Sequence, residues 1–148
     1  MSGIVGKPGS KSGILGDNGG IGYEEGTFTF SLKGTSGSAG SWAQSSQTGY
    51  YRKIGSTVYF DCVCYLTNTG SYSGYAVVEG LPFTAIAEQF AITLAGFPND
   101  SASDFAARIT ANSNQVVFRK GNKLDFAVDY SEITTGYRMV ITGFYFTS

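Results

Sequence analysis

The chain has 148 residues, of which 14 % are charged and 15 % are aromatic, and its formal net charge is −1. Lysine and arginine are scattered singly, which argues against a nucleic-acid partner, and the apolar runs are far shorter than the roughly 20 residues that cross a bilayer. The sequence contains no histidine, so the commonest general base and metal ligand are missing. We therefore expect no enzyme activity, no cofactor, no metal site, no nucleic acid and no membrane contact.

Residues 1–26 are predicted to form an extended Gly/Ser-rich arm and hinge, followed by one body over residues 27–148. Within the arm, Ser-Gly-Ile-Val-Gly at residues 2–6 returns as Ser-Gly-Ile-Leu-Gly at residues 12–16. Pairs of aliphatic residues among glycines do not offset the entropy lost on ordering the chain. We predict that the arm is anchored in another chain, with packing on its own body as the alternative, through its aliphatic side chains Ile4, Val5, Ile14 and Leu15. The start has no secretion signal, which favours synthesis in a cytoplasm.

The body is predicted to begin with a strand over residues 27–32, because Phe28, Phe30 and Leu32 alternate with hydroxyl residues. Further along, Gly55-Ser56 suits a two-residue II′ turn, which places glycine first. That turn would join residues 49–54 and 57–66 as a hairpin.

The strand at residues 57–66 has two different faces. Val58, Phe60 and Cys62 point one way, and Tyr59, Asp61 and Val63 point the other. An aromatic face that keeps a carboxylate suits an interface between subunits better than a core or open water. We predict that this interface contains Tyr59, Val63 and Tyr65.

The two cysteines, Cys62 and Cys64, share one face of that strand. Their Cα atoms would be about 6.5 to 7 Å apart, which is awkward for a disulfide. Without histidine or a second cysteine pair, a zinc site also lacks ligands. We expect two small buried thiols.

Two polar loops each carry one large aromatic residue. Trp42 lies in residues 33–48, and Tyr72 lies in residues 67–74. Aromatic residues in Gly/Ser loops stack on sugars or make rigid contacts with proteins. We name Trp42 and Tyr72 as outer contacts; the alternatives are a lid over the core for Trp42 and scattered surface aromatics for both.

The remaining strands are predicted at residues 75–79, 89–95, 105–111, 115–119, 123–128 and 137–147. About nine strands without a convincing helix indicate an all-β fold, a jelly-roll-like antiparallel β-sandwich. The last strand is apolar on both faces, with Phe144 and Phe146 on one and Tyr145 on the other. It needs two covers, a second sheet and a neighbouring subunit, and we assign Tyr145 to the subunit interface.

Paired carboxylates do not converge in this pattern. Glu24 and Glu25 are adjacent in a strand and would point to opposite faces. Asp125 and Asp129 share a face but lie about 13 Å apart, which is too far for paired acid and base chemistry.

Three segments together resemble a β-domain of bacteriophage virion proteins, which occurs in tail-fibre tips, head fibres and capsid-decorating proteins. They are Tyr-Glu-Glu-Gly-Thr-Phe-Thr at residues 23–29, Thr-Gly-Tyr-Tyr-Arg-Lys-Ile-Gly-Ser-Thr-Val-Tyr-Phe at residues 48–60, and Gly-Leu-Pro-Phe at residues 80–83. Phe30 stands where the family often has proline, and Tyr51 replaces a usual threonine. The resemblance implies a jelly-roll-like sandwich that is usually trimeric and has a structural or adhesive role in the virion.

Two functions follow from this resemblance. The first is a trimeric capsid-decorating (cement) protein, anchored by its arm in the major capsid protein, with the tyrosine interface joining the trimer. The alternative is a short tail fibre or receptor-binding tip, attached to other tail proteins, whose loops contact host glycans. A third hypothesis, a carbohydrate-active enzyme, would need a carboxylate pair that only the fold brings together.

Overall fold

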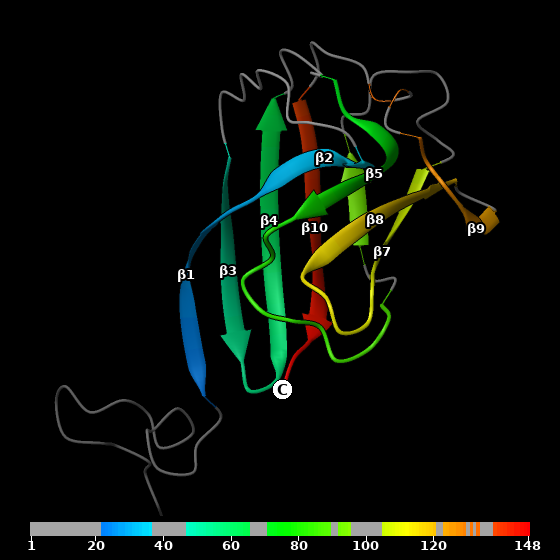
Figure 1. The fold of residues 1–148 in the computed structure, drawn as a ribbon. Coiled ribbons are helices and arrows are strands. Elements are labelled where there is room, and N and C mark those ends of the chain that lie inside the picture. The colour runs from blue at the N-terminus through cyan, green and yellow to red at the C-terminus, as the bar shows by residue number, and fades with distance from the viewer. Residues whose placement is uncertain are drawn as a thin grey trace, which may run out of the picture.

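The computed structural model describes residues 22–36, 47–65, 71–89, 92–95, 105–120, 123–129, 131, 133 and 138–148. These residues form ten strands in two antiparallel sheets that pack face to face (Figure 1). No described residue belongs to an α-helix, so no helix there is long and apolar enough to cross a membrane. The predicted all-β sandwich is confirmed.

The first sheet has the strand order β1-β3-β4-β10-β6. Its strands are β1 (Tyr23–Thr29), β3 (Thr48–Ile54), β4 (Thr57–Tyr65), β10 (Arg138–Phe146) and β6 (Ile92–Ala95). The second sheet has the order β2-β5-β8-β7, and β9 also pairs with β8. Its strands are β2 (Ser31–Ser36), β5 (Ser73–Glu79), β8 (Gln115–Lys120), β7 (Phe105–Ile109) and β9 (Lys123–Ala127).

Strand β1 begins four residues before the predicted boundary of the body. Tyr23 pairs with Ile54 of β3, and the ladder continues to Thr29. Phe30 then carries the chain from the first sheet to the second, where β2 begins, and it is buried between them. Residues 1–21 lie outside the described part, so the predicted anchors Ile4, Val5, Ile14 and Leu15 stay a prediction.

The hairpin at Gly55-Ser56 is confirmed. Residue 54 pairs with residue 57, which leaves two residues in the turn. Gly55 has φ 59°, as the first central position of a II′ turn requires. The turn sets the register of the whole β3–β4 ladder.

The core lies between the sheets and takes alternate residues from the long central strands. From β4 it takes Val58, Phe60 and Cys62, each at most 1 % exposed. Cys62 is buried, as expected, whereas the side chain of Cys64 lies outside the described part. Full burial of a side chain such as Phe60 contributes about 1.5 to 3 kcal/mol.

Tyr145 corrects the prediction for the last strand. It is 0 % exposed and lies in the core, with its ring 5.9 Å from that of Phe60. Its hydroxyl accepts a hydrogen bond from the backbone N–H of Phe83 at 3.1 Å, and burial raises its pKa to about 12. The alternation along β10 is as predicted, but Phe144 and Phe146 are the residues that face outward.

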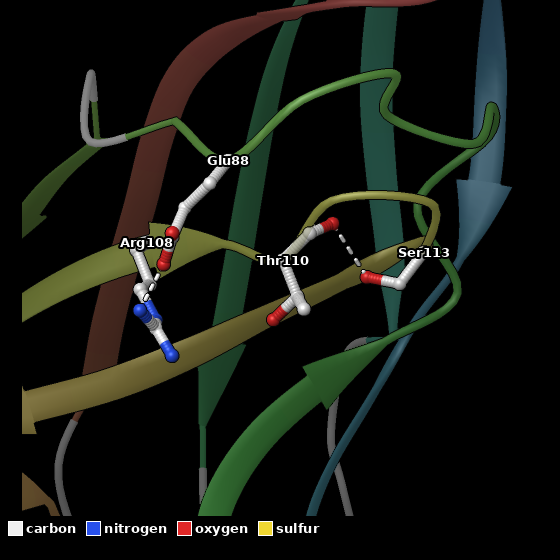
Figure 2. A network of polar contacts seen from close by, with 4 residues as sticks. All are labelled: Glu88, Arg108, Thr110 and Ser113. Carbon is white, nitrogen blue, oxygen red and sulfur yellow. Dashed lines mark hydrogen bonds and ion pairs between the residues drawn. The ribbon is translucent and has the colours of Figure 1, made fainter. Parts of the chain in front are cut away.

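Residues 80–89 close one end of the sandwich against the turn between β7 and β8. The backbone N–H of Ala85 donates to Ser113 O, and that of Asn112 donates to Ala85 O, both at 2.8 Å. Figure 2 shows Glu88 paired with Arg108 and the Ser113 hydroxyl bonded to Thr110 O. This interlock holds the loop across the β7–β8 hairpin.

Candidate binding face

The face of the first sheet that points away from the core collects most of the exposed apolar side chains. Of the eight large hydrophobic side chains that are exposed in the described part, six lie here. We call this surface the outer face, and its main residues are Tyr23, Glu25, Tyr50, Arg52, Ile54, Tyr59, Asp61, Phe144 and Phe146.

The strand register arranges these side chains in rows across the sheet. One row runs through Glu25, Arg52, Tyr59 and Phe144, on β1, β3, β4 and β10. In the next row, Tyr50 stands opposite Asp61. The two tyrosines are therefore diagonal neighbours, and each has a charged residue directly opposite it. Diagonal neighbours on a sheet are about 7 to 8 Å apart, within reach of aromatic side chains.

A hollow of about 400 Å³ opens among these side chains. Glu25, Tyr50, Arg52, Tyr59 and Asp61 line it, together with Gly26 and Tyr51. Tyr50 is 61 % exposed and Tyr59 is 49 % exposed, so both rings are accessible. The hollow therefore combines aromatic surfaces with hydrogen-bonding groups of both charges.

Hydrogen bonds orient the two carboxylates at the hollow. Glu25 Oε2 accepts from the hydroxyl of Tyr23 at 2.5 Å and lies 3.8 Å from Arg52 Nε. Asp61 Oδ1 accepts from the hydroxyl of Thr142 at 2.6 Å. The bond to Glu25 raises the pKa of Tyr23, because the hydroxyl must keep its proton to donate. An ionised carboxylate has about four acceptor positions, so each can accept further donors.

At one end of the outer face lie three exposed apolar side chains, Ile54, Phe144 and Phe146, and the loop residue Ile86 is bonded to this end through its backbone. We call these four residues the apolar end. The rings of Phe144 and Phe146 are 6.1 Å apart, and Phe144 lies 5.9 Å from Tyr59. Ile86 is 53 % exposed, and its backbone N–H donates to Phe146 O at 3.0 Å. Exposed apolar side chains gathered in this way are typical of surfaces that another protein covers.

The structure separates the predicted interface residues. Tyr59 lies exposed and Val63 half-buried on the side of β4 opposite the core residues, as the alternation predicted. The side chain of Tyr65 lies outside the described part. Tyr145 is a core residue, so its assignment to an interface was wrong.

The structure describes only one of the two predicted loop contacts. Tyr72 is half-buried and packs against the core, and its role as an outer contact stays a prediction. Tyr75, the third residue of β5, is the exposed aromatic residue of this segment and is 56 % exposed. Trp42 lies outside the described residues.

Tyr50 and Arg52 are the parts of the hollow that sequence reasoning missed. The signal was present, since a two-residue turn at Gly55-Ser56 places Arg52 opposite Tyr59 and Tyr50 opposite Asp61. The place of Phe144 beside Tyr59 was not found, because nothing in the local sequence shows that β10 pairs with β4, which lies far away along the chain.

The described part of the chain offers few groups for catalysis or for metal binding. There, no three His, Cys, Asp or Glu side chains cluster in a way that could hold a metal ion. Glu24 and Glu25 point to opposite faces, as predicted, and Glu24 accepts from the hydroxyl of Tyr51 at 2.6 Å. Asp129 accepts from the hydroxyl and the backbone N–H of Ser131, which lowers its pKa and gives it a structural role.

Comparisons with known proteins identify the fold. No family model and no curated protein matches the chain. Among solved structures, the Dettilon tailspike protein matches with a TM-score of 0.61 and 22 % sequence identity. The match covers 83 % of this chain and 23 % of the tailspike chain, so the present sequence corresponds to less than a quarter of that protein.

Proposed function

We propose that the chain is a non-catalytic β-sandwich module of a bacteriophage virion, located in the tail, which contacts the surface of the host cell. The observation that carries the proposal is the likeness in fold between most of the chain and one part of a tailspike protein. Three sequence segments that resemble virion β-domains point to the same class of particle. A tail position corresponds to the receptor-binding alternative predicted from the sequence.

The outer face supports a contact role. It presents tyrosine rings, a guanidinium and two carboxylates from three neighbouring strands of a rigid sheet. Rigid aromatic side chains with polar groups between them give large contact area at low cost in side-chain entropy. The two carboxylates lie on β1 and β4, with β3 between them. Their strands are two strand spacings, about 10 Å, apart, and the two residues lie in different rows, so their backbone positions are not those of directly opposed carboxylates, which favours binding over hydrolysis.

Capsid decoration is the second candidate, and the repeated arm is the observation that favours it. Two aliphatic pairs ten residues apart would suit grooves between capsid subunits. The same arm would equally attach the module to another tail protein. The two candidates therefore differ in where the chain sits in the particle rather than in how the arm works.

We also propose that the chain assembles as a homotrimer through the apolar end. Tyr59 borders this end and was predicted as an interface residue; Phe144, Phe146, Ile54 and Ile86 extend the surface. The charged hollow lies on the other side of Tyr59 and would remain open. A subunit contact and a ligand site can thus share one sheet.

Position in the particle tests the proposed function. Phage particles would be labelled with gold-conjugated antibodies raised against the full chain and viewed by electron microscopy. We expect gold at the tail. Gold distributed over the head would favour capsid decoration and contradict the tail proposal. An antibody that labels no part of the particle, yet binds denatured virion protein, would contradict an exposed role of either kind.

A further inference from the structure

We propose that the hollow on the outer face binds a neutral saccharide of one or two pyranose rings, presented by a host surface glycan. This inference rests on the proposed contact with the host and assigns it a site and a ligand class. The observation that supports the inference is a two-by-two arrangement on neighbouring strands, in which Tyr50 is opposite Asp61 and Arg52 is opposite Tyr59.

The arrangement matches the two chemical aspects of a pyranose. The C–H-rich face of the ring packs on an aromatic surface, and Tyr50 and Tyr59 supply two exposed rings at diagonal positions. The hydroxyl groups around the rim of a sugar both donate and accept hydrogen bonds. Carboxylates of Glu25 and Asp61 accept, and the guanidinium of Arg52 donates, so groups of both kinds surround the rings.

The polar groups are held in place before a ligand arrives. Thr142 fixes Asp61, and Tyr23 fixes Glu25, each through a hydroxyl donor. Glu25 in turn lies beside the guanidinium of Arg52. The residues that line the hollow all belong to strands rather than loops. Preorganisation of this kind reduces the entropy lost on binding.

The volume and the net charge of the hollow restrict the class of ligand that it can bind. A volume of about 400 Å³ is near the lower end of the range of about 300 to 1,000 Å³ for small-molecule sites, which suits a short saccharide. Two carboxylates face one guanidinium, so the hollow carries a net charge of −1. It would repel uronic acids, sialic acids and phosphorylated sugars, and a neutral sugar avoids that repulsion.

A second copy of the chain is a weaker occupant for this part of the face. The side chains of Arg52 and Glu25 are 73 % and 60 % exposed, and burying them under another protein would remove both charges from water. The apolar end carries no such penalty. We therefore assign the apolar end to the neighbouring subunit and the hollow to the sugar.

A glycan microarray that holds neutral and acidic bacterial oligosaccharides tests this inference. The probe is the fluorescently labelled full chain, compared with Tyr50→Ala, Tyr59→Ala and Arg52→Ala. We expect the wild type to bind neutral glycans and each variant to bind them about tenfold more weakly or worse, the scale of one lost aromatic or charge-assisted contact. Tyr75→Ala is the matched control, because Tyr75 is equally exposed but lies on the second sheet. It should bind as the wild type does.

Each other outcome overturns the inference. Binding confined to acidic glycans would refute the ligand class, and neutral binding that survives Tyr50→Ala and Tyr59→Ala would refute the site. A folded chain that binds no glycan would refute both. If light scattering shows that Tyr59→Ala also dissociates an oligomer, the test of the glycan site rests on Tyr50→Ala and Arg52→Ala alone. A chain that binds host cells but no array glycan would leave the tail function standing, whereas gold labelling on the head would remove the function whatever the array shows.

Discussion

The ring of Phe28 lies across the backbone of Gly49, its register partner in the neighbouring strand. A Cβ atom on Gly49 would stand 2.4 Å from Cζ of that ring and less than 3.0 Å from two more of its atoms. Phe28 packs against the core together with Phe30 and Tyr51. The contact fastens the edge strand β1, which carries Glu25 of the hollow, to the rest of the sheet.

The first prediction is that Gly49→Ala destabilises the protein by about 1 to 3 kcal/mol, because the ring must leave its packed position. Urea unfolding followed by tryptophan and tyrosine fluorescence measures the change. Thr48→Ala, an exposed change at the next position, is the control and should stay within about 0.5 kcal/mol. Equal stability of Gly49→Ala and the wild type would contradict the described contact.

The second prediction concerns Tyr145. Replacing it with phenylalanine leaves the backbone N–H of Phe83 without its acceptor, which should cost about 1 to 3 kcal/mol at neutral pH. Urea midpoints of Tyr145→Phe and the wild type at pH 7 measure this cost. Tyr75→Phe, at an exposed position, is the control.

The same residue predicts a dependence on alkaline pH. The folded-state pKa of Tyr145 is raised to about 12 from an ordinary value of 10.0. A raised pKa means that its contribution to stability is complete below pH 10.0 and is lost as the pH rises through about 12. The fall in urea midpoint between these limits should be smaller in Tyr145→Phe than in the wild type. An identical fall in both proteins would contradict the buried, neutral hydroxyl.

The third prediction concerns Glu79 at low pH. Lys33 and Gln115 donate to its carboxylate, which lowers its pKa from the ordinary 4.5. A lowered pKa gives stability that is present above pH 4.5 and lost as the pH falls through the folded-state value. Glu79→Gln should therefore lose less stability than the wild type between pH 6 and pH 3, measured by thermal unfolding at each pH. Glu24→Gln is the control, and if it flattens the profile as much, the assignment to Glu79 fails.

The fourth prediction is that Phe144→Ser with Phe146→Ser dissociates the proposed homotrimer. Both side chains are exposed on the apolar end, so the change should leave the fold of the single chain intact. Size-exclusion chromatography with light scattering should report three chains for the wild type and one for the double variant. A wild type that is already monomeric at micromolar concentration, or a double variant that remains trimeric, would contradict the interface.

Period-two alternation was enough to predict most of the strands and most of the core. The predicted strand over residues 27–32 was wrong in its bounds, because the chain changes sheets at Phe30 and β2 continues into the predicted loop to Ser36. Val58, Phe60 and Cys62 point inward because they occupy alternate positions of one strand, and the turn at Gly55-Ser56 follows from glycine's freedom at φ 59°. Such signals are local, so they can be recognised in the sequence without knowing which strand is the partner.

The side of the sheet that a strand shows to the core is not a local property. β10 is apolar on both faces, and only its place between β4 and β6 makes Tyr145 a core residue and Phe144 a surface residue. Tyr72, just before β5, packs against the core for a similar reason, because the position of its strand in the sandwich is not a local property. The hollow needs three strands in register, and β1 pairs with β3 although β2, which belongs to the other sheet, lies between them in the sequence, so sequence order does not reveal the pairing.

Competition for the host surface tests the proposed host contact most directly. Host cells would be incubated with excess full chain, and the adsorption rate of the phage proposed to carry it would then be measured. We predict that the wild-type chain slows adsorption in a saturable manner, that Tyr50→Ala does so less effectively, and that Tyr75→Ala matches the wild type. Adsorption that proceeds at its normal rate in the presence of excess folded chain would contradict the proposed role.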